Sequence, residues 1–92
     1  MKSFNWSNDK NLWLQDIRKV CFEDAVREIT EHRVLDNFKH PNQKTYPNQK
    51  IFIIAINGYA CRVPYIESEE TIFFKTIIPS RQATKKYLVN KP

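Results

Sequence analysis

The chain has 92 residues, enough for one domain, and its hydrophobic share of 41% and aromatic share of 13% can fill one modest core. Fifteen Lys and Arg against ten Asp and Glu give a formal net charge of +5, which indicates either a polyanionic partner such as nucleic acid or an ordinary solvated basic surface. No apolar run has the length of a membrane span, and the N-terminus lacks the apolar segment of a signal peptide, so we expect no membrane partner.

The cysteines and the standard motifs give no sign of a cofactor. Cys21 and Cys61 lack CxxC spacing and have no cluster of histidines nearby, so zinc binding is not indicated. The chain contains neither a P-loop nor a Gly-x-Ser-x-Gly element. We therefore expect two reduced thiols in a cytoplasmic protein that uses no metal and no cofactor.

Two helices are predicted first in chain order. Ser7 or Asn8 can cap a helix over about residues 9–19. Its expected apolar side consists of Trp6, Trp13, Ile17 and Val20, flanked by Leu12 and Leu14. A second helix is predicted over residues 22–31, because apolar residues recur there at the spacing of one buried stripe: Phe22, Ala25, Val26 and Ile29.

Strands and a closing helix are predicted in the remainder. A short strand over 34–38 precedes a polar segment over 39–50. The apolar run 51–56 is typical of a strand covered on both faces. The Asn57-Gly58 pair predicts a hairpin turn to a strand over 59–66, and a further strand is expected over 71–78. Ser80 can cap a last helix over 81–88.

These elements predict an α+β fold in a single domain over residues 1–92. It has two N-terminal helices, an antiparallel β-meander of about four strands and a C-terminal helix. If Ile66 pairs with Thr71, Tyr65 faces Ile72 and Val63 faces Phe74. The core side of the last two strands would then carry Tyr59, Cys61, Val63, Tyr65, Ile72, Phe74 and Ile78.

The same assumed pairing places Arg62 directly opposite Lys75 on the other face of the sheet. Like charges in this position are destabilising unless an anion lies between them. Arg can bind a phosphate with two hydrogen bonds and Lys adds a point charge, so the pair predicts a phosphate site. Two separate cations on a solvated face are the alternative.

Two further segments carry cations. In the closing helix, Arg81 and Lys85 share one face and Lys86 is adjacent, while the helix N-terminus could bind an anion. The segment 39–50 has cationic and aromatic character from Lys39, His40, Lys44, Tyr46 and Lys50. The candidate nucleic-acid contacts are Lys44, Tyr46, Lys50 and Lys86. A solvated basic helix and a plain connecting loop are the alternatives.

The chemistry available to such residues is metal-free cleavage of RNA. The 2′-hydroxyl can attack its own neighbouring phosphate if a base removes its proton and cations stabilise the transition state. Arg81 and Arg62 are the expected phosphate clamps, with Lys75 and Lys85 adding charge. His40, Tyr65 or a lysine with a lowered pKa could transfer the proton, and Tyr46 or Tyr65 could stack on a base.

Several short motifs occur in a recognisable order. Phe4-Asn5-Trp6 is similar to an opening Phe-x-Trp-Asp element, with Ser7 in place of the Asp. The segment 20–25, Val-Cys-Phe-Glu-Asp-Ala, is similar to Val-Ser-Phe-Glu-Glu-Ala, with Cys21 in place of a capping Ser. The segment 77–83, Ile-Ile-Pro-Ser-Arg-Gln-Ala, is similar to Ile-Ile-Ser-Ala-Arg-x-Ala. Over nearly its whole length the chain thus resembles the BrnT family of type II toxins, a branch of the RelE-like ribonuclease toxins.

The resemblance implies a compact sheet with flanking helices and RNA cleavage without a metal. It also implies inhibition by a ribbon-helix-helix antitoxin that represses the operon. Toxin and antitoxin could form a heterotetramer. The motif match assigns a family role to Arg81, and Tyr87 falls near a tyrosine common in the last helix; a family arginine falls nearest Thr76 here. Two other hypotheses stay open: a non-catalytic RNA- or protein-binding module, as a decayed toxin or operon regulator, and a module whose basic face docks an acidic protein.

Overall fold

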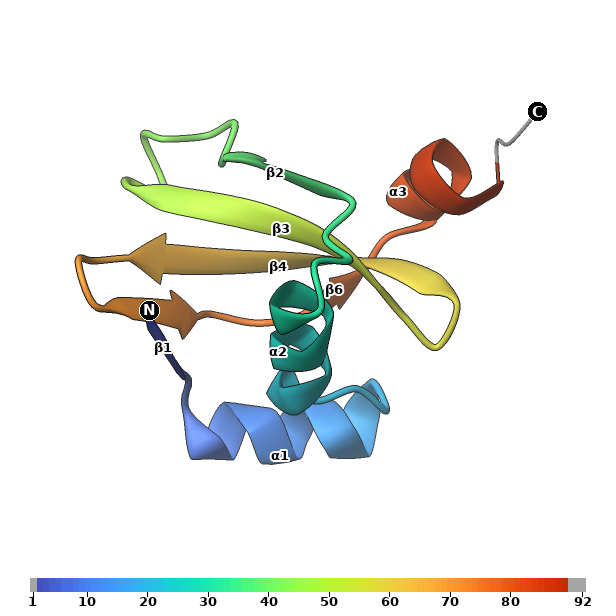
Figure 1. The fold of residues 1–92 in the computed structure, drawn as a ribbon, viewed down its shortest axis with the longest axis horizontal. Coiled ribbons are helices and arrows are strands. Elements are labelled where there is room, and N and C mark those ends of the chain that lie inside the picture. Colours follow the sequence, from blue (N-terminus) through green and yellow to red (C-terminus); the bar gives the residue numbers. More distant parts are fainter. Residues whose placement is uncertain (1, 90–92) are drawn as a thin grey trace.

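The computed structural model describes residues 2–89 and has the α+β architecture that the sequence predicts (Figure 1). Two N-terminal helices are followed by a mixed sheet and a short C-terminal helix. The elements are β1 (Ser3–Asn5), α1 (Asn8–Ile17), α2 (Phe22–Thr30), β2 (Asp36–Lys39), β3 (Gln49–Ile56), β4 (Tyr59–Glu67), β5 (Thr71–Phe74), β6 (Ile78–Pro79), α3 (Arg81–Thr84) and the π-helical turn η1 (Lys85–Val89).

The described strands form one sheet in the order β1-β5-β4-β3-β2, with β6 also paired to β4. The N-terminal strand β1 runs parallel to β5 and was not predicted, so the sheet is mixed rather than a purely antiparallel meander. The Asn57-Gly58 turn between β3 and β4 is confirmed, and both residues have positive φ.

The strand predicted over 71–78 is interrupted after Phe74, and Pro64 supplies the reason. The amide of Lys75 donates a hydrogen bond to the carbonyl of Pro64. Proline has no N–H to return a bond to Lys75, so the ladder between β4 and β5 ends there. The chain resumes pairing with β4 at β6, where Ile78 lies opposite Arg62.

The register between β4 and β5 differs by two residues from the expected one. Tyr65 lies opposite Phe74, and Ile66 lies opposite Phe73. Because side chains alternate with a period of two, this shift preserves the faces of the sheet but changes every partner. The predicted Arg62–Lys75 pair is therefore wrong.

One face of the sheet packs against α1 and α2 and holds the main core (Figure 1). Phe74 lies at its centre, with ring centroids of Phe4 and Phe22 at 5.6 and 5.7 Å. The fully or nearly buried members of this core are Leu14, Val20, Phe22, Ala25, Phe52, Ile54, Ile56, Cys61, Val63, Tyr65, Ile72, Phe74 and Ile77. Ile77 takes the core position that was predicted for Ile78, which is exposed.

Helix α1 turns a different side inward from the one predicted. Its buried residues are Asn11 and Leu14, whereas Trp13 and Ile17 are exposed. The Trp13 ring lies beneath the cations of Lys10 and Arg18, 4.2 and 4.8 Å from its centroid. Cation–π contacts therefore cover part of the Trp13 ring, which is not buried in the core.

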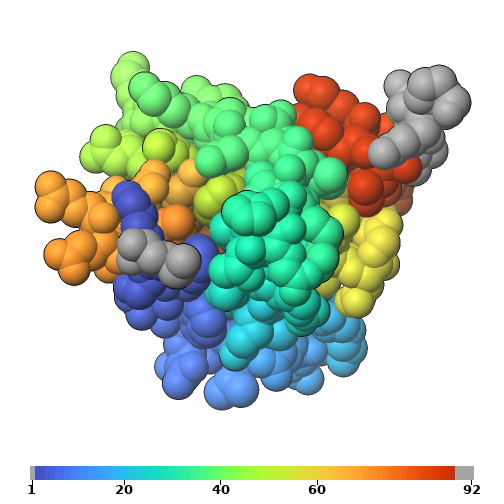
Figure 2. Space-filling model, viewed as in Figure 1, coloured from blue at the N-terminus to red at the C-terminus, as the bar shows by residue number. Residues whose placement is uncertain are grey.

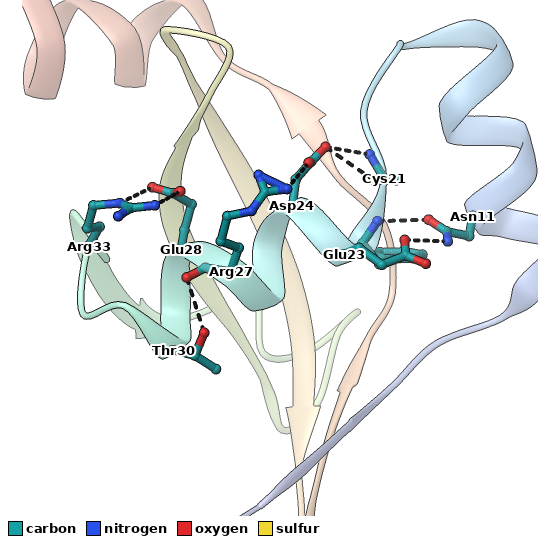
Figure 3. Close-up of polar contacts among 9 residues, drawn as sticks. Asn11, Cys21, Glu23, Asp24, Arg27, Glu28, Thr30 and Arg33 are labelled. Carbon is teal, nitrogen blue, oxygen red and sulfur yellow. Dashed lines mark hydrogen bonds and ion pairs between the residues drawn. The ribbon is translucent and has the colours of Figure 1, made fainter.

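The buried amide of Asn11 joins α1 to the start of α2 (Figure 3). Its Oδ1 accepts a hydrogen bond from the amide of Phe22 at 2.8 Å, and its Nδ2 donates to Glu23 Oε1 at 2.8 Å. The amide of Cys21 donates to Asp24 Oδ2 at 3.1 Å. These bonds satisfy amides at the beginning of α2 that have no partner within the helix.

The opposite face of the sheet carries a smaller second core. It consists of Ile51, Ile53, Ala60 and Ala83, with Leu35, Tyr87 and Leu88 packed against it. Strand β3 is thus covered on both faces, as predicted. The amide of Ser80 donates to the carbonyl of Ala60 at 2.9 Å, and the Thr84 hydroxyl accepts from the amide of Ala60 at 2.9 Å.

The helix caps are confirmed, whereas the helix lengths differ from the expected ones. Ser7 caps α1 through the amide of Lys10, and Ser80 caps α3 through the amide of Ala83. Helix α1 ends at Ile17 rather than residue 19, and the helix predicted over 81–88 is one α-helical turn followed by η1. No helix among the described residues has the length and apolar composition needed to cross a bilayer.

Candidate functional site

The acidic residues are distributed unevenly along the chain. The sequence has no Asp or Glu after Glu70, and Asp36 is the only one between Glu31 and Glu67. Within residues 2–89, every ion pair uses a carboxylate of α2, of the residue that follows it, or of the C-terminal end of β4: Asp24, Glu28, Glu31 and Glu67. The cations of β4, of the 75–77 segment and of α3 are therefore left without acidic partners in the described part of the chain.

A pocket of about 370 Å³ opens between β2 and the C-terminal helix, on the sheet face away from α1 and α2. Figure 2 shows this border, where the green atoms of the β2 segment meet the red atoms of α3. We call it the α3 pocket, and it is lined by Asp36, Phe38, Pro41, Ile53, Arg62, Ser80, Gln82, Ala83, Lys86 and Tyr87.

One wall of the α3 pocket is a hydrogen-bonded pair. The hydroxyl of Tyr87 donates to Asp36 Oδ2, and the amide of Asn37 donates to Asp36 Oδ1 at 2.8 Å. These two bonds, the tyrosine first, lower the pKa of Asp36 below its ordinary value. The same contact raises the pKa of Tyr87. At neutral pH the pocket thus holds a carboxylate beside a neutral phenol.

Two cations line the same pocket. Arg62 extends from β4 and Lys86 from η1, and neither is in an ion pair with any described residue. The Lys86 ammonium lies 5.2 Å from the centroid of the Tyr87 ring. Because Arg62 and Lys86 are 24 residues apart in sequence, only the packing of η1 against the sheet brings them together. Two cations in this arrangement could bind an anion.

Aromatic and apolar surface completes the pocket. Phe38 lies on β2 opposite Ile51 and leaves 37% of its surface exposed. Pro41 and Ile53 lie beside it in the lining. An exposed ring beside cations can stack on a nucleobase, while the cations bind its phosphate.

The remaining predicted phosphate ligands do not line the α3 pocket. Lys75 follows β5, and its ammonium lies 5.6 Å from the Phe73 ring centroid. Arg81 and Lys85 are exposed on α3 and η1 next to lining residues of the pocket. The amide of Ala83 is bonded to Ser80, so one of the N-terminal amides that were expected to be free is already occupied.

The predicted proton-transfer groups are also outside the pocket. Tyr65 is 1% exposed on the opposite face of the sheet, and its hydroxyl donates to Asn37 at 2.6 Å. Burial raises the pKa of Tyr65. His40 Nδ1 accepts a hydrogen bond from the amide of Asn42 at 3.0 Å, so in the neutral ring Nε2 carries the proton and can only donate.

The loop between β2 and β3 brings two of its predicted contacts together and separates the others. His40 and Tyr46 are neighbours, with ring centroids 4.4 Å apart, and Lys44 is exposed. Lys50 pairs with Glu67 at 3.1 Å, and both line a separate pocket of about 360 Å³ with Lys39. Lys50 is thereby held in an ion pair, whereas neither cation of the α3 pocket forms one with a described residue.

Sequence reasoning named Arg62 and Lys86 but missed Asp36 and Phe38 as site residues, and it noted Tyr87 only through the family motif. One sequence signal could have indicated Asp36: it is the lone acid in a long basic stretch. Its contact with Tyr87 spans 51 positions and has no local signature. Among the described residues no three His, Cys, Asp or Glu side chains gather as metal ligands would.

Comparisons with known proteins add no assignment. Searches against protein-family models, curated proteins and solved structures give no match to this chain. The candidate site therefore rests on its own geometry.

Proposed function

We propose that this chain is a metal-independent endoribonuclease toxin of a type II toxin–antitoxin module. The observation that carries the proposal is the α3 pocket, where the unpaired cations Arg62 and Lys86 lie beside the exposed Phe38 ring. A net charge of +5 and the motif order that resembles the BrnT toxins support the same function.

The proposed reaction needs no cofactor. The 2′-oxygen of a ribose attacks the adjacent phosphorus and gives up its proton to solvent water, while the bond to the 5′-oxygen breaks and that oxygen takes up a proton from water. The products are a 2′,3′-cyclic phosphate and a free 5′-hydroxyl. Negative charge grows on the phosphoryl oxygens in the transition state, where Arg62 and Lys86 act most strongly.

Other cations would extend the contact along the RNA strand. Arg81 and Lys85 adjoin the pocket, and Lys75 adds charge beside Phe73. Lys44, Tyr46 and the Nε2–H of His40 would contact RNA at the loop between β2 and β3. These residues position the strand, and contacts of this kind carry much of the salt dependence of binding.

The proposed module acts in the cytoplasm, which suits two free thiols, Cys21 and Cys61. A cognate antitoxin, of the ribbon-helix-helix class in this proposal, would cover the basic surface, in an assembly that could be a heterotetramer. Unpaired cations on β4, η1 and the 75–77 segment offer an acidic partner complementary charge.

A cleavage assay on the purified full chain tests the proposal. Single-stranded RNA should be degraded in EDTA, and Arg62→Gln and Lys86→Gln should each lower the rate by about 10²-fold or more. Lys10→Gln removes one equal charge from α1 and should leave the rate unchanged. Arg81→Ala should abolish growth arrest on induction. Intact RNA in every preparation that is correctly folded would refute the nuclease.

A non-catalytic RNA-binding module is the second candidate, and one observation favours it. Neither Tyr65 nor His40 is available as the predicted base, because Tyr65 is buried and His40 Nδ1 is occupied by Asn42. This candidate predicts RNA binding that weakens in Arg62→Gln, no cleavage and no growth arrest. Cleavage that falls in Arg62→Gln would exclude it.

A further inference from the structure

We infer that the α3 pocket is a guanine-specific nucleotide subsite, in which the carboxylate of Asp36 reads the base and Arg62 and Lys86 hold its phosphate. The inference deepens the proposed function by naming the base, and it rests on that function only for the RNA to which the guanine belongs. Binding of a free nucleotide tests it without any cleavage.

The carboxylate is the feature that a plain phosphate site does not explain. A negative charge in an anion-binding pocket repels phosphate, and Asp36 is the only acid among the lining residues of the α3 pocket. Its oxygens accept from a phenol and a backbone amide, and it makes no ion pair with a described residue, although the Lys86 charge contributes to its lowered pKa. A carboxylate in this position suits a ligand that has hydrogen-bond donors as well as a phosphate.

The carboxylate also retains acceptor capacity. Each carboxylate oxygen can accept two hydrogen bonds. Tyr87 uses one site on Oδ2 and Asn37 uses one site on Oδ1, so one site on each oxygen is left. The two existing bonds fix the orientation of the group, which reduces the entropy lost when a ligand binds.

Among the four RNA bases, only guanine matches two adjacent acceptors. Its Watson–Crick edge presents the N1–H and the N2 amino group side by side. Adenine and cytosine each present one amino group next to an unprotonated ring nitrogen, which a carboxylate repels. Uracil has a single N–H between two carbonyl oxygens. An acceptor-only group therefore selects guanine by attraction and rejects the others by repulsion.

The rest of the α3 pocket suits the remainder of a nucleotide. Phe38 and Pro41 offer flat apolar surface for the purine ring, and the Tyr87 ring lies at the same wall. Arg62 and Lys86 supply charge for the phosphate, and Gln82 adds a polar side chain. A volume of about 370 Å³ lies at the small end of ligand pockets, the size expected for one nucleotide unit.

Titration of the isotope-labelled full chain with single nucleotides, followed by NMR, tests the inference. GMP should bind about tenfold or more tightly than AMP, CMP or UMP, as expected for one bidentate contact. Asp36→Asn should lose this preference. Because its amide places one donor beside one acceptor, the variant should instead gain affinity for xanthosine monophosphate and UMP, whose edges present an N–H beside a carbonyl.

Asp16→Asn is the matched control, since it removes one carboxylate charge from exposed surface of α1 and should keep the wild-type preference. Asp36→Asn retains an oxygen that can accept from Tyr87, and an unchanged NMR spectrum away from the pocket verifies its fold. The inference fails if the folded variant keeps the wild-type ranking of nucleotides, or if wild type binds all four equally. In either case Asp36 serves only to bind Tyr87.

The outcomes separate this inference from the nuclease proposal. Preferential GMP binding without RNA cleavage would retain the guanine subsite and refute the nuclease. Cleavage with no preference for guanosine, together with equal binding of the four nucleotides, would retain the nuclease and refute the guanine subsite.

Discussion

The hydroxyl of Tyr87 donates a hydrogen bond to the carboxylate of Asp36, and this contact ties the C-terminal turn η1 to the edge strand β2. It is the largest cause of the lowered pKa of Asp36, because the bond stabilises the charged form. It also holds in place one wall of the α3 pocket.

Tyr87→Phe should therefore raise the pKa of Asp36 toward its ordinary value. The backbone bond from Asn37 remains, so the pKa should stay somewhat lowered. A carboxyl-detected NMR titration of wild type and variant measures the change directly. Tyr46→Phe removes a hydroxyl from the exposed loop and should leave the pKa of Asp36 where it is; an equal change in both variants would argue against a specific bond.

Asn11→Ala should lower the free energy of unfolding by about 2 kcal/mol. The substitution leaves the buried amide of Phe22 without its acceptor and removes the donor to Glu23. The pKa of Glu23, which this donor lowers, should rise in parallel. Urea unfolding gives the stability, and Asn8→Ala, at an exposed position of the same helix, should change it by less than about 0.5 kcal/mol.

Phe74→Ala should cost about 3–5 kcal/mol, because it removes the ring at the centre of the main core. Phe74 is 1% exposed and stacks on Phe4, Trp6 and Phe22. The adjacent Phe73 is 38% exposed on the other face, so Phe73→Ala should cost less than about 1 kcal/mol. Similar losses for the two variants would show that Phe74 is not the residue of this pair that faces the core.

Cys61 should make the protein less stable at high pH. Burial raises the pKa of its thiol from 9.0 to about 11. A folded pKa above the unfolded one means that stability is fully present below about pH 9 and falls as the pH rises toward 11. Urea unfolding at pH 8, 9.5 and 11 should show a loss that is smaller in Cys61→Ala. Equal pH dependence in the two proteins would contradict a buried neutral thiol.

Helices α1 and α2 show when a local apolar pattern is sufficient to predict which side of a helix is buried. Apolar residues of α2 recur on one side only, and the predicted range of 22–31 is close to the observed Phe22–Thr30. In α1, apolar residues occur on several sides, so periodicity could not tell which side faces inward. The side that packs inward is set by Leu14 in the core and by the bonds of Asn11 to α2.

The sequence by itself determined the fold class, the caps at Ser7 and Ser80, the Asn57-Gly58 turn and the burial of β3, because each depends on neighbouring residues or on a regular period. Only the tertiary structure decided the register of β5 and the α3 pocket. A shift of two residues leaves the same side chains on each face of the sheet, so the period of two cannot choose between the expected and the observed register. The Asp36–Tyr87 contact and the meeting of Arg62 with Lys86 arise when η1 packs on the sheet, and no local sequence pattern records a contact between residues so far apart in the chain.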